Sequence, residues 1–109
     1  MTTITIYQDH EKAPVGFSTK GHAGFGDYGN DIVCAAISVL VINTINSIES
    51  FTDCAFSAEA DENSGNIEFH LKGEAEPDAV LLLRSMILGL QSIQNDYGKK
   101  FLRLHFKEV

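Results

Sequence analysis

The segment from Asn30 to Glu49 constrains the fold more than any other part of the chain. Its first part, Ile32 to Ile42, is the longest mostly apolar run in the sequence. The β-branched residues of this run favour strand locally, but strands rarely exceed about ten residues, so the length predicts a helix. Asn30 or Asp31 is the predicted N-cap. Because the helix is apolar almost all round, it must be buried on most sides or dock on another subunit.

Patterns on both sides of this helix predict five strands and a second helix. The predicted strands are 2–8, 15–22, 51–60, 66–72 and 99–107, the last with Leu102, Leu104 and Phe106 pointing inward. The second helix begins near Pro77 and closes at Gly98. Its buried stripe comprises Ala79, Leu83, Met86, Leu90 and Ile93. The order ββαββαβ predicts one α/β domain over residues 1–109, a two-layer sandwich whose mixed sheet carries both helices on one face.

The charge and the chain length limit the possible partners. The 109 residues suffice for one core, and eight Lys and Arg stand against fifteen Asp and Glu, a net charge of −7. This charge argues against direct contact with nucleic acid and suits a basic peptide or protein, although it also serves plain solubility. The N-terminus lacks the pattern of a signal peptide. Ile32 to Ile42 falls short of the roughly 20 residues of a membrane span, so we expect a cytoplasmic protein without a membrane partner.

The two cysteines need separate explanations. Cys34 and Cys54 form no CxxC pair, and a reducing compartment makes a disulfide between them unfavourable. Cys54 lies in a predicted strand and is interpreted as a small buried hydrophobe. The remaining histidines have no metal-ligand spacing, so neither a metal nor a cofactor is expected; they are His10, His70 and His105.

Residues 21–34 combine a histidine, a glycine-rich loop and a cysteine at the start of a helix. The first helical turn offers N–H groups and a partial positive charge that favour a thiolate at Cys34 and could stabilise an oxyanion. If the loop folds back, His22 reaches this sulfur, deprotonates it and later protonates the leaving amine. The alternative interpretation is structural: Cys34 as a core residue and His22 as a surface residue.

Several neighbours of this pair have two possible roles. Asp31 either orients His22 or caps the helix. Ser38 lies one turn after Cys34 on the same helix face, where its hydroxyl bonds at the site or to its own helix. Phe25 and Tyr28 either cover a bound peptide or anchor the loop to the core.

The same loop contains a misleading motif. Gly24, Gly26 and Gly29 spell the G-x-G-x-x-G of dinucleotide-binding folds. However, Asp27 and Asp31 would repel a pyrophosphate, and paired strands replace the repeated βαβ pattern of such folds. The sequence therefore disfavours a nucleotide cofactor.

The stretch GHAGFGDYGNDIVCAAIS resembles the signature of the ribosomal-processing cysteine protease family, Prp. The shared features are Gly-His at a strand end, a glycine loop, and Asp-x-x-Cys-Ala-Ala-x-Ser opening a helix. The resemblance implies a catalytic dyad of His22 and Cys34, with Gly21, Asp31 and Ser38 near it. It also implies a homodimer and, as substrate, the N-terminal extension of a large-subunit ribosomal protein.

Three hypotheses follow. The first is a cysteine endopeptidase with Cys34 as nucleophile and His22 as base. The second is a non-catalytic binding module of the ribosome-assembly type, for which binding would survive loss of Cys34. The third is another thiol-dependent enzyme, such as an acyl transferase, which only analysis of the products would distinguish.

Overall fold

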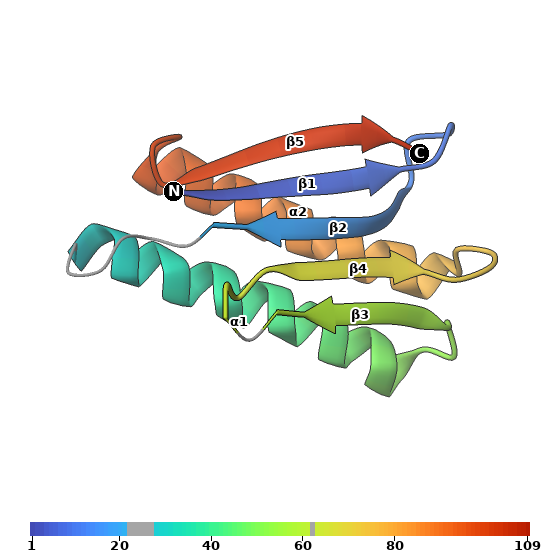
Figure 1. Ribbon diagram of the computed structural model, residues 1–109. Helices are drawn as coiled ribbons and strands as arrows, with labels where there is room; N and C mark the ends of the chain where they lie inside the picture. Colours follow the sequence, from blue (N-terminus) through green and yellow to red (C-terminus); the bar gives the residue numbers. More distant parts are fainter. Residues whose placement is uncertain (22–27, 62) are drawn as a thin grey trace.

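The computed structural model describes residues 1–21, 28–61 and 63–109, and it forms a five-stranded sheet with two helices on one face (Figure 1). The elements are β1 (Thr2–Gln8), β2 (Pro14–Lys20), α1 (Tyr28–Phe51), β3 (Phe56–Ala60), β4 (Ile67–Leu71), α2 (Pro77–Tyr97) and β5 (Leu102–Glu108). The strand order is β3-β4-β2-β1-β5. β1 and β5 run parallel, and the other neighbouring strands run antiparallel. The predicted two-layer sandwich with a mixed sheet is confirmed.

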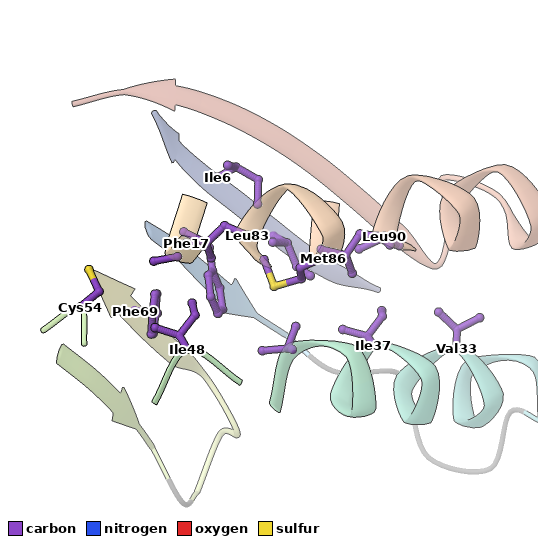
Figure 2. Close-up of a cluster of buried hydrophobic side chains, with 14 residues drawn as sticks. Ile6, Phe17, Val33, Ile37, Ile48, Cys54, Phe69, Leu83, Met86 and Leu90 are labelled. Carbon is purple, nitrogen blue, oxygen red and sulfur yellow. The ribbon is translucent and has the colours of Figure 1, made fainter. Parts of the chain in front are cut away.

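The core fills the space between the sheet and the helices. Alternate strand residues such as Ile4, Ile6 and Phe17 face the helices and are fully buried. The predicted stripe of α2 meets them, with Ile93 packed at its edge. α1 contributes Val33, Ile37, Val41 and Ile48. Figure 2 shows side chains from both helices and the sheet converging on this layer. The rings of Phe17 and Phe69 stack there with centroids 5.1 Å apart.

A glycine in β2 allows two rings to meet on the other face of the sheet. Gly16 pairs with Tyr7 on β1 and with His70 on β4, so it lies between them. Strands on either side of a third strand are about 9.5 Å apart, yet the Tyr7 and His70 rings are stacked, with centroids 5.0 Å apart and ring planes 11° from parallel. Both side chains therefore lean over the glycine. A Cβ at Gly16 would lie 2.5 Å from the backbone oxygen of Phe69.

Replacing Gly16 by alanine is expected to destabilise the protein by about 2–3 kcal/mol, because a backbone oxygen cannot move aside as a side chain can. Urea unfolding followed by circular dichroism measures the change. Gly89→Ala is the matched control. Its Cβ would meet only the flexible side chain of Leu40, so we expect a smaller loss of stability. Equal stability losses in the two variants would contradict this explanation.

Helix α1 differs from its prediction at both ends. It begins at Tyr28, so Asn30 and Asp31 lie inside the helix and their prediction as N-cap residues is wrong. It ends at Phe51, where the third strand was predicted to begin. The hydroxyl of Thr52 donates to the carbonyl oxygen of Ile48 at 2.7 Å. This hydrogen bond lies at the C-terminal end of α1, and β3 begins only at Phe56.

Residues 32–51 of α1 are long and apolar enough to cross a membrane by length and composition, with a mean hydropathy of 1.8. The apolar segment is thus longer than the run of Ile32 to Ile42 used in the sequence analysis. In the fold, however, the side chains of Val33, Val41 and Ile48 are fully buried against the sheet and α2. One face of this helix therefore belongs to the core of the sandwich, while 28% of the apolar segment as a whole is buried.

Strand β5 also departs from its prediction. It begins at Leu102, because Lys99 and Lys100 form a turn in which the Phe101 N–H bonds the carbonyl oxygen of Gly98 at 3.2 Å. Phe106 faces the helix layer as predicted, since it pairs in register with the fully buried Ile6, but 48 % of it is exposed. β5 is an edge strand, and there the ring lines only a shallow groove beside α2.

Candidate functional site

Cys34 lies on α1 where one end of the sheet meets the helix. Its side chain is half-buried and lines a cavity of about 80 Å³. Four parts of the chain build this cavity: the start of β1, the end of β2, one face of α1, and the start of β4 with its preceding turn. The other lining residues are Thr2, Thr19, Gly21, Ile37, Ser38, Val41, Gly65 and Ile67.

The position of Cys34 in its helix differs from the prediction. Because α1 begins at Tyr28, the cysteine lies in the second helical turn rather than the first. The unpaired N–H groups and the dipole effect are confined to the first turn. The argument that a helix start activates Cys34, and the oxyanion site inferred from it, are therefore wrong as stated. The reactivity of Cys34 must depend on the groups around the cavity instead.

Gly21 ends β2 because of its backbone conformation. Its φ is +78°, a region that side chains other than glycine rarely adopt, and a Cβ there would lie 2.7 Å from the carbonyl oxygen of Met1. The prediction that β2 includes Gly21 and continues to residue 22 is therefore wrong for Gly21. The Gly21 N–H donates to Oδ1 of Asn66 at 3.2 Å. This bond ties the end of β2 to the turn before β4, beside the Cys34 cavity.

Two threonines complete the strand side of the cavity. The Thr19 hydroxyl oxygen accepts the Ile67 N–H at 3.2 Å, and Thr2 bonds through its N–H to the carbonyl oxygen of Phe101 at 2.9 Å. Sequence reasoning missed these residues and Asn66. The only available signal was the turn-forming run at residues 63–66, and nothing in it indicated contact with Gly21, which is 45 residues away in the sequence.

A larger groove adjoins the cavity and shares Thr19 and Ile67 with it. It has a volume of about 390 Å³ and is lined by three carboxylates and one lysine: Glu59, Asp61, Glu68 and Lys20. The backbone N–H of Asn63, together with Ser64, bonds the Asp61 carboxylate and holds its pKa below the ordinary value. Asp61 is therefore ionised at neutral pH, and the groove beside the cavity carries negative charge.

The predicted site residues fall into three groups. Gly21, Cys34 and Ser38 lie together at the cavity. His22 and Phe25 lie outside the described residues, so the predicted contact of His22 with Cys34 remains a prediction. Tyr28 and Asp31 lie in the first turn of α1. Cys54 is buried, as predicted, and belongs to the core rather than to the cavity.

This arrangement suits chemistry by a sulfur nucleophile. The thiol is neither fully buried nor free on the surface, and a cavity next to it offers room for part of a substrate. Glycines on two sides, Gly21 and Gly65, leave the backbone accessible there. Among the described residues, no group of three His, Cys, Asp or Glu is placed to hold a metal ion.

Comparison with known proteins identifies close relatives. Residues 1–101 match the profile of a family described as "Cysteine protease Prp". The ribosomal processing cysteine protease Prp of Staphylococcus aureus (strain Mu50 / ATCC 700699) is 31% identical over 107 residues, covering 98% of this chain and 100% of the relative. The protein of the same name from Bacillus subtilis (strain 168) is 32% identical over 101 residues, covering 89% and 90%.

A solved structure shares the fold. The crystal structure of the essential ribosomal processing protease Prp from S. aureus, in complex with a covalently linked product peptide, has a TM-score of 0.89 and 31% identity to this chain. The alignment covers 98% of this chain and 100% of that one. The similarity therefore includes all the elements that build the Cys34 cavity.

Proposed function

Because this chain belongs to the cysteine protease Prp family, we propose that it removes an N-terminal extension from a large-subunit ribosomal protein in the cytoplasm. The family confirms the resemblance drawn from residues 21–38, and the chain is a cysteine protease. The observation that carries the specific proposal is the half-buried Cys34 at the cavity, in a chain whose relatives are ribosomal processing proteases.

We propose Cys34 as the nucleophile and His22 as its base. The Cys34 thiol gives its proton to His22, and the sulfur attacks the carbonyl carbon of the scissile peptide bond. The C–N bond breaks while the imidazolium returns its proton to the leaving amine. Water, deprotonated by His22, then attacks the thioester. The C–S bond breaks, the acid product leaves, and the sulfur regains a proton.

Neighbouring residues are given supporting roles in this proposal. Asp31 orients His22, and the Ser38 hydroxyl bonds at the site, since Ser38 is exposed at the cavity one turn beyond Cys34. Phe25 and Tyr28 cover the bound peptide. The Gly21 backbone, held by Asn66, sets the direction in which the chain leaves β2 toward His22.

Electrostatics supports a basic substrate. The net charge is −7, and the groove beside the cavity carries the ionised Asp61 with two further carboxylates. Ribosomal proteins are basic because they neutralise RNA phosphates. Attraction between the two surfaces would raise the rate of encounter and weaken with added salt.

The cleavage of the extended ribosomal protein tests the proposal directly. We expect the enzyme to release one short N-terminal peptide, detected by mass spectrometry, and to leave unchanged a ribosomal protein that lacks the extension. Enzyme treated with iodoacetamide serves as the control and is expected to release none, because alkylation removes the nucleophile.

Two results would contradict the proposal. Binding of the extended protein without any product would favour the non-catalytic assembly module. Transfer of an acyl group to an acceptor other than water, seen as a product of higher mass, would favour another thiol enzyme.

We also propose that the protein is a homodimer. The helix layer leaves large apolar side chains exposed on its outer surface, among them Val39 on α1, and Leu81 and Leu88 on α2, each at least 64% exposed. Such residues mark a contact surface when they lie together. Light scattering after gel filtration is expected to give twice the chain mass of 11.9 kDa, and a monomer at micromolar concentration would contradict this proposal.

A further inference from the structure

The face of the sheet opposite the helices collects positive charge along one edge. In β5, Leu102 faces the helices and is fully buried, so the alternate residues Arg103, His105 and Lys107 point to the opposite face. All three are exposed. Both helices lie on the other side of the sheet, and no described element covers this face (Figure 1).

The neighbours of these residues on the same face are uncharged. Arg103, His105 and Lys107 pair in register with Thr3, Thr5 and Tyr7 of β1. The printed sequence places four of its eight Lys and Arg within residues 99–107, a segment without Asp or Glu. The net charge of −7 describes the whole chain and hides this local cluster of positive charge. The expectation that the protein does not contact nucleic acid was based on the net charge alone.

Carboxylates do not neutralise this cationic edge within the described part of the chain. There the ion pairs are His10 with Glu11 and His70 with Glu68, so neither Arg103 nor Lys107 has a carboxylate within 4.0 Å. The acidic residues that share the open face, Glu59 and Glu68, belong to β3 and β4. The Glu68 carboxylate reaches across β2 and accepts from the Tyr7 hydroxyl at 3.2 Å, so its charge comes within one strand of Lys107, whereas Arg103 at the other end of β5 pairs with Thr3.

The spacing and chemistry of this edge suit a phosphate backbone. Alternate residues of a strand are about 6.6 Å apart, so the cations Arg103 and Lys107 form a row with the His105 imidazole between them. Lys99 and Lys100 lie in the turn before β5, where the Lys100 ammonium lies 4.9 Å from the centroid of the Phe101 ring. The hydroxyl groups of Thr3 and Thr5 stand beside the row and can donate to phosphate or ribose oxygens. Uncovered sheet faces are a recurrent platform for single-stranded RNA.

We propose that the open face of β5 and β1 binds single-stranded RNA through its phosphates, without sequence preference. An anionic membrane fits less well, because interfacial binding also needs apolar side chains among the cations, and the row itself contains none. A purely protective role, in which charges keep the edge strand β5 from pairing with another chain, predicts no affinity for RNA. The proposal is independent of the catalytic role of Cys34.

Fluorescence anisotropy with a labelled oligouridylate of about twelve nucleotides tests the proposal. At about 50 mM salt we expect saturable binding with a Kd below about 100 µM. Three or four phosphate contacts predict that the logarithm of the binding constant falls with the logarithm of the salt concentration with a slope of about −2 to −3. Absence of saturable binding under these conditions would overturn the proposal.

Charge reversal locates the surface. The double variant Arg103→Glu/Lys107→Glu is expected to weaken RNA binding more than about tenfold and to reduce the salt slope by about 1–2. The matched control, Lys72→Glu/Arg84→Glu, makes the same change in net charge at two exposed residues outside the open face. Lys72 follows β4, and Arg84 on α2 lines the groove on the helix side of β5, so the control is expected to change the affinity less than about threefold. Equal weakening in both variants would overturn the assignment to β5.

Three further measurements separate the alternatives. Arg103→Gln/Lys107→Gln repeats the test with smaller disturbance if the charge reversal impairs folding. Both β5 variants are expected to cleave a short peptide substrate at the wild-type rate, since β5 takes no part in the Cys34 cavity. Sedimentation with phosphatidylserine vesicles, combined with absence of RNA binding, would overturn the proposal in favour of a membrane surface.

Discussion

Replacing Cys34 by alanine is expected to reduce the rate of N-terminal peptide release by at least about a thousandfold. The reason is chemical: without the sulfur no thioester forms, and the cavity alone can only hold the peptide. Replacing His22 by alanine is expected to reduce the rate by about 10²–10⁴-fold, the usual contribution of a general base. Initial rates of cleavage of the extended ribosomal protein measure both effects.

Cys54→Ala is the matched control for the nucleophile. Cys54 is the other cysteine of the chain, only 7% exposed and packed in the core, so its loss is expected to leave the cleavage rate unchanged. Full activity of Cys34→Ala would exclude Cys34 as the nucleophile. Loss of activity in Cys34→Ala with a normal rate in His22→Ala would keep the nucleophile and reject the dyad.

Replacing Phe69 by alanine is expected to lower the free energy of unfolding by about 3–5 kcal/mol. Phe69 is fully buried on β4, and its ring lies 5.1 Å from those of both Phe17 and Phe56. Removing it leaves a cavity in the layer shown in Figure 2, where Phe69 lies toward the end that contains Cys54. A domain of this size has a total stability of about 5–15 kcal/mol, so the variant approaches the limit of folding.

Phe51→Ala is the matched control for Phe69→Ala, because it makes the same change of side chain at an exposed position. Phe51 ends α1 and is 77% exposed, so its loss is expected to change the stability by less than about 0.5 kcal/mol. The chain has no tryptophan, so urea unfolding is best followed by far-ultraviolet circular dichroism. Similar midpoints for the two variants would show that burial of Phe69 does not control stability.

Most helices and strands of this fold could be predicted from the sequence, because each is specified by residues within its own segment. Strand β1 matches its prediction at both ends, since the alternation in Thr2 to Gln8 stops at the polar, turn-like segment that begins at Asp9. Helix α2 begins at Pro77 as predicted, because proline suits a first helical position. The order of strands was not predicted. It depends on which strands pair across the sheet, and no local pattern specifies that β5 lies beside β1.

The site was predicted less completely than the fold. Cys34 stands out because a thiol near glycines and a histidine is uncommon, and the structure places it at a cavity. The activation argument failed because Asn30 and Asp31 look like caps in composition, although α1 starts earlier, at Tyr28. Asn66 and Thr19 were missed because only tertiary folding brings the turn before β4 to the end of β2.

The parallel pairing of β1 with β5 has a practical consequence for work with this protein. Thr2 lines the Cys34 cavity, while the last residue, Val109, bonds through its N–H to Gln8 at the other end of β1. The two termini therefore leave from opposite ends of the sheet (Figure 1). A purification tag placed ahead of Met1 would extend beside the cavity and obstruct the peptide, whereas a tag after Val109 would leave the entrance free.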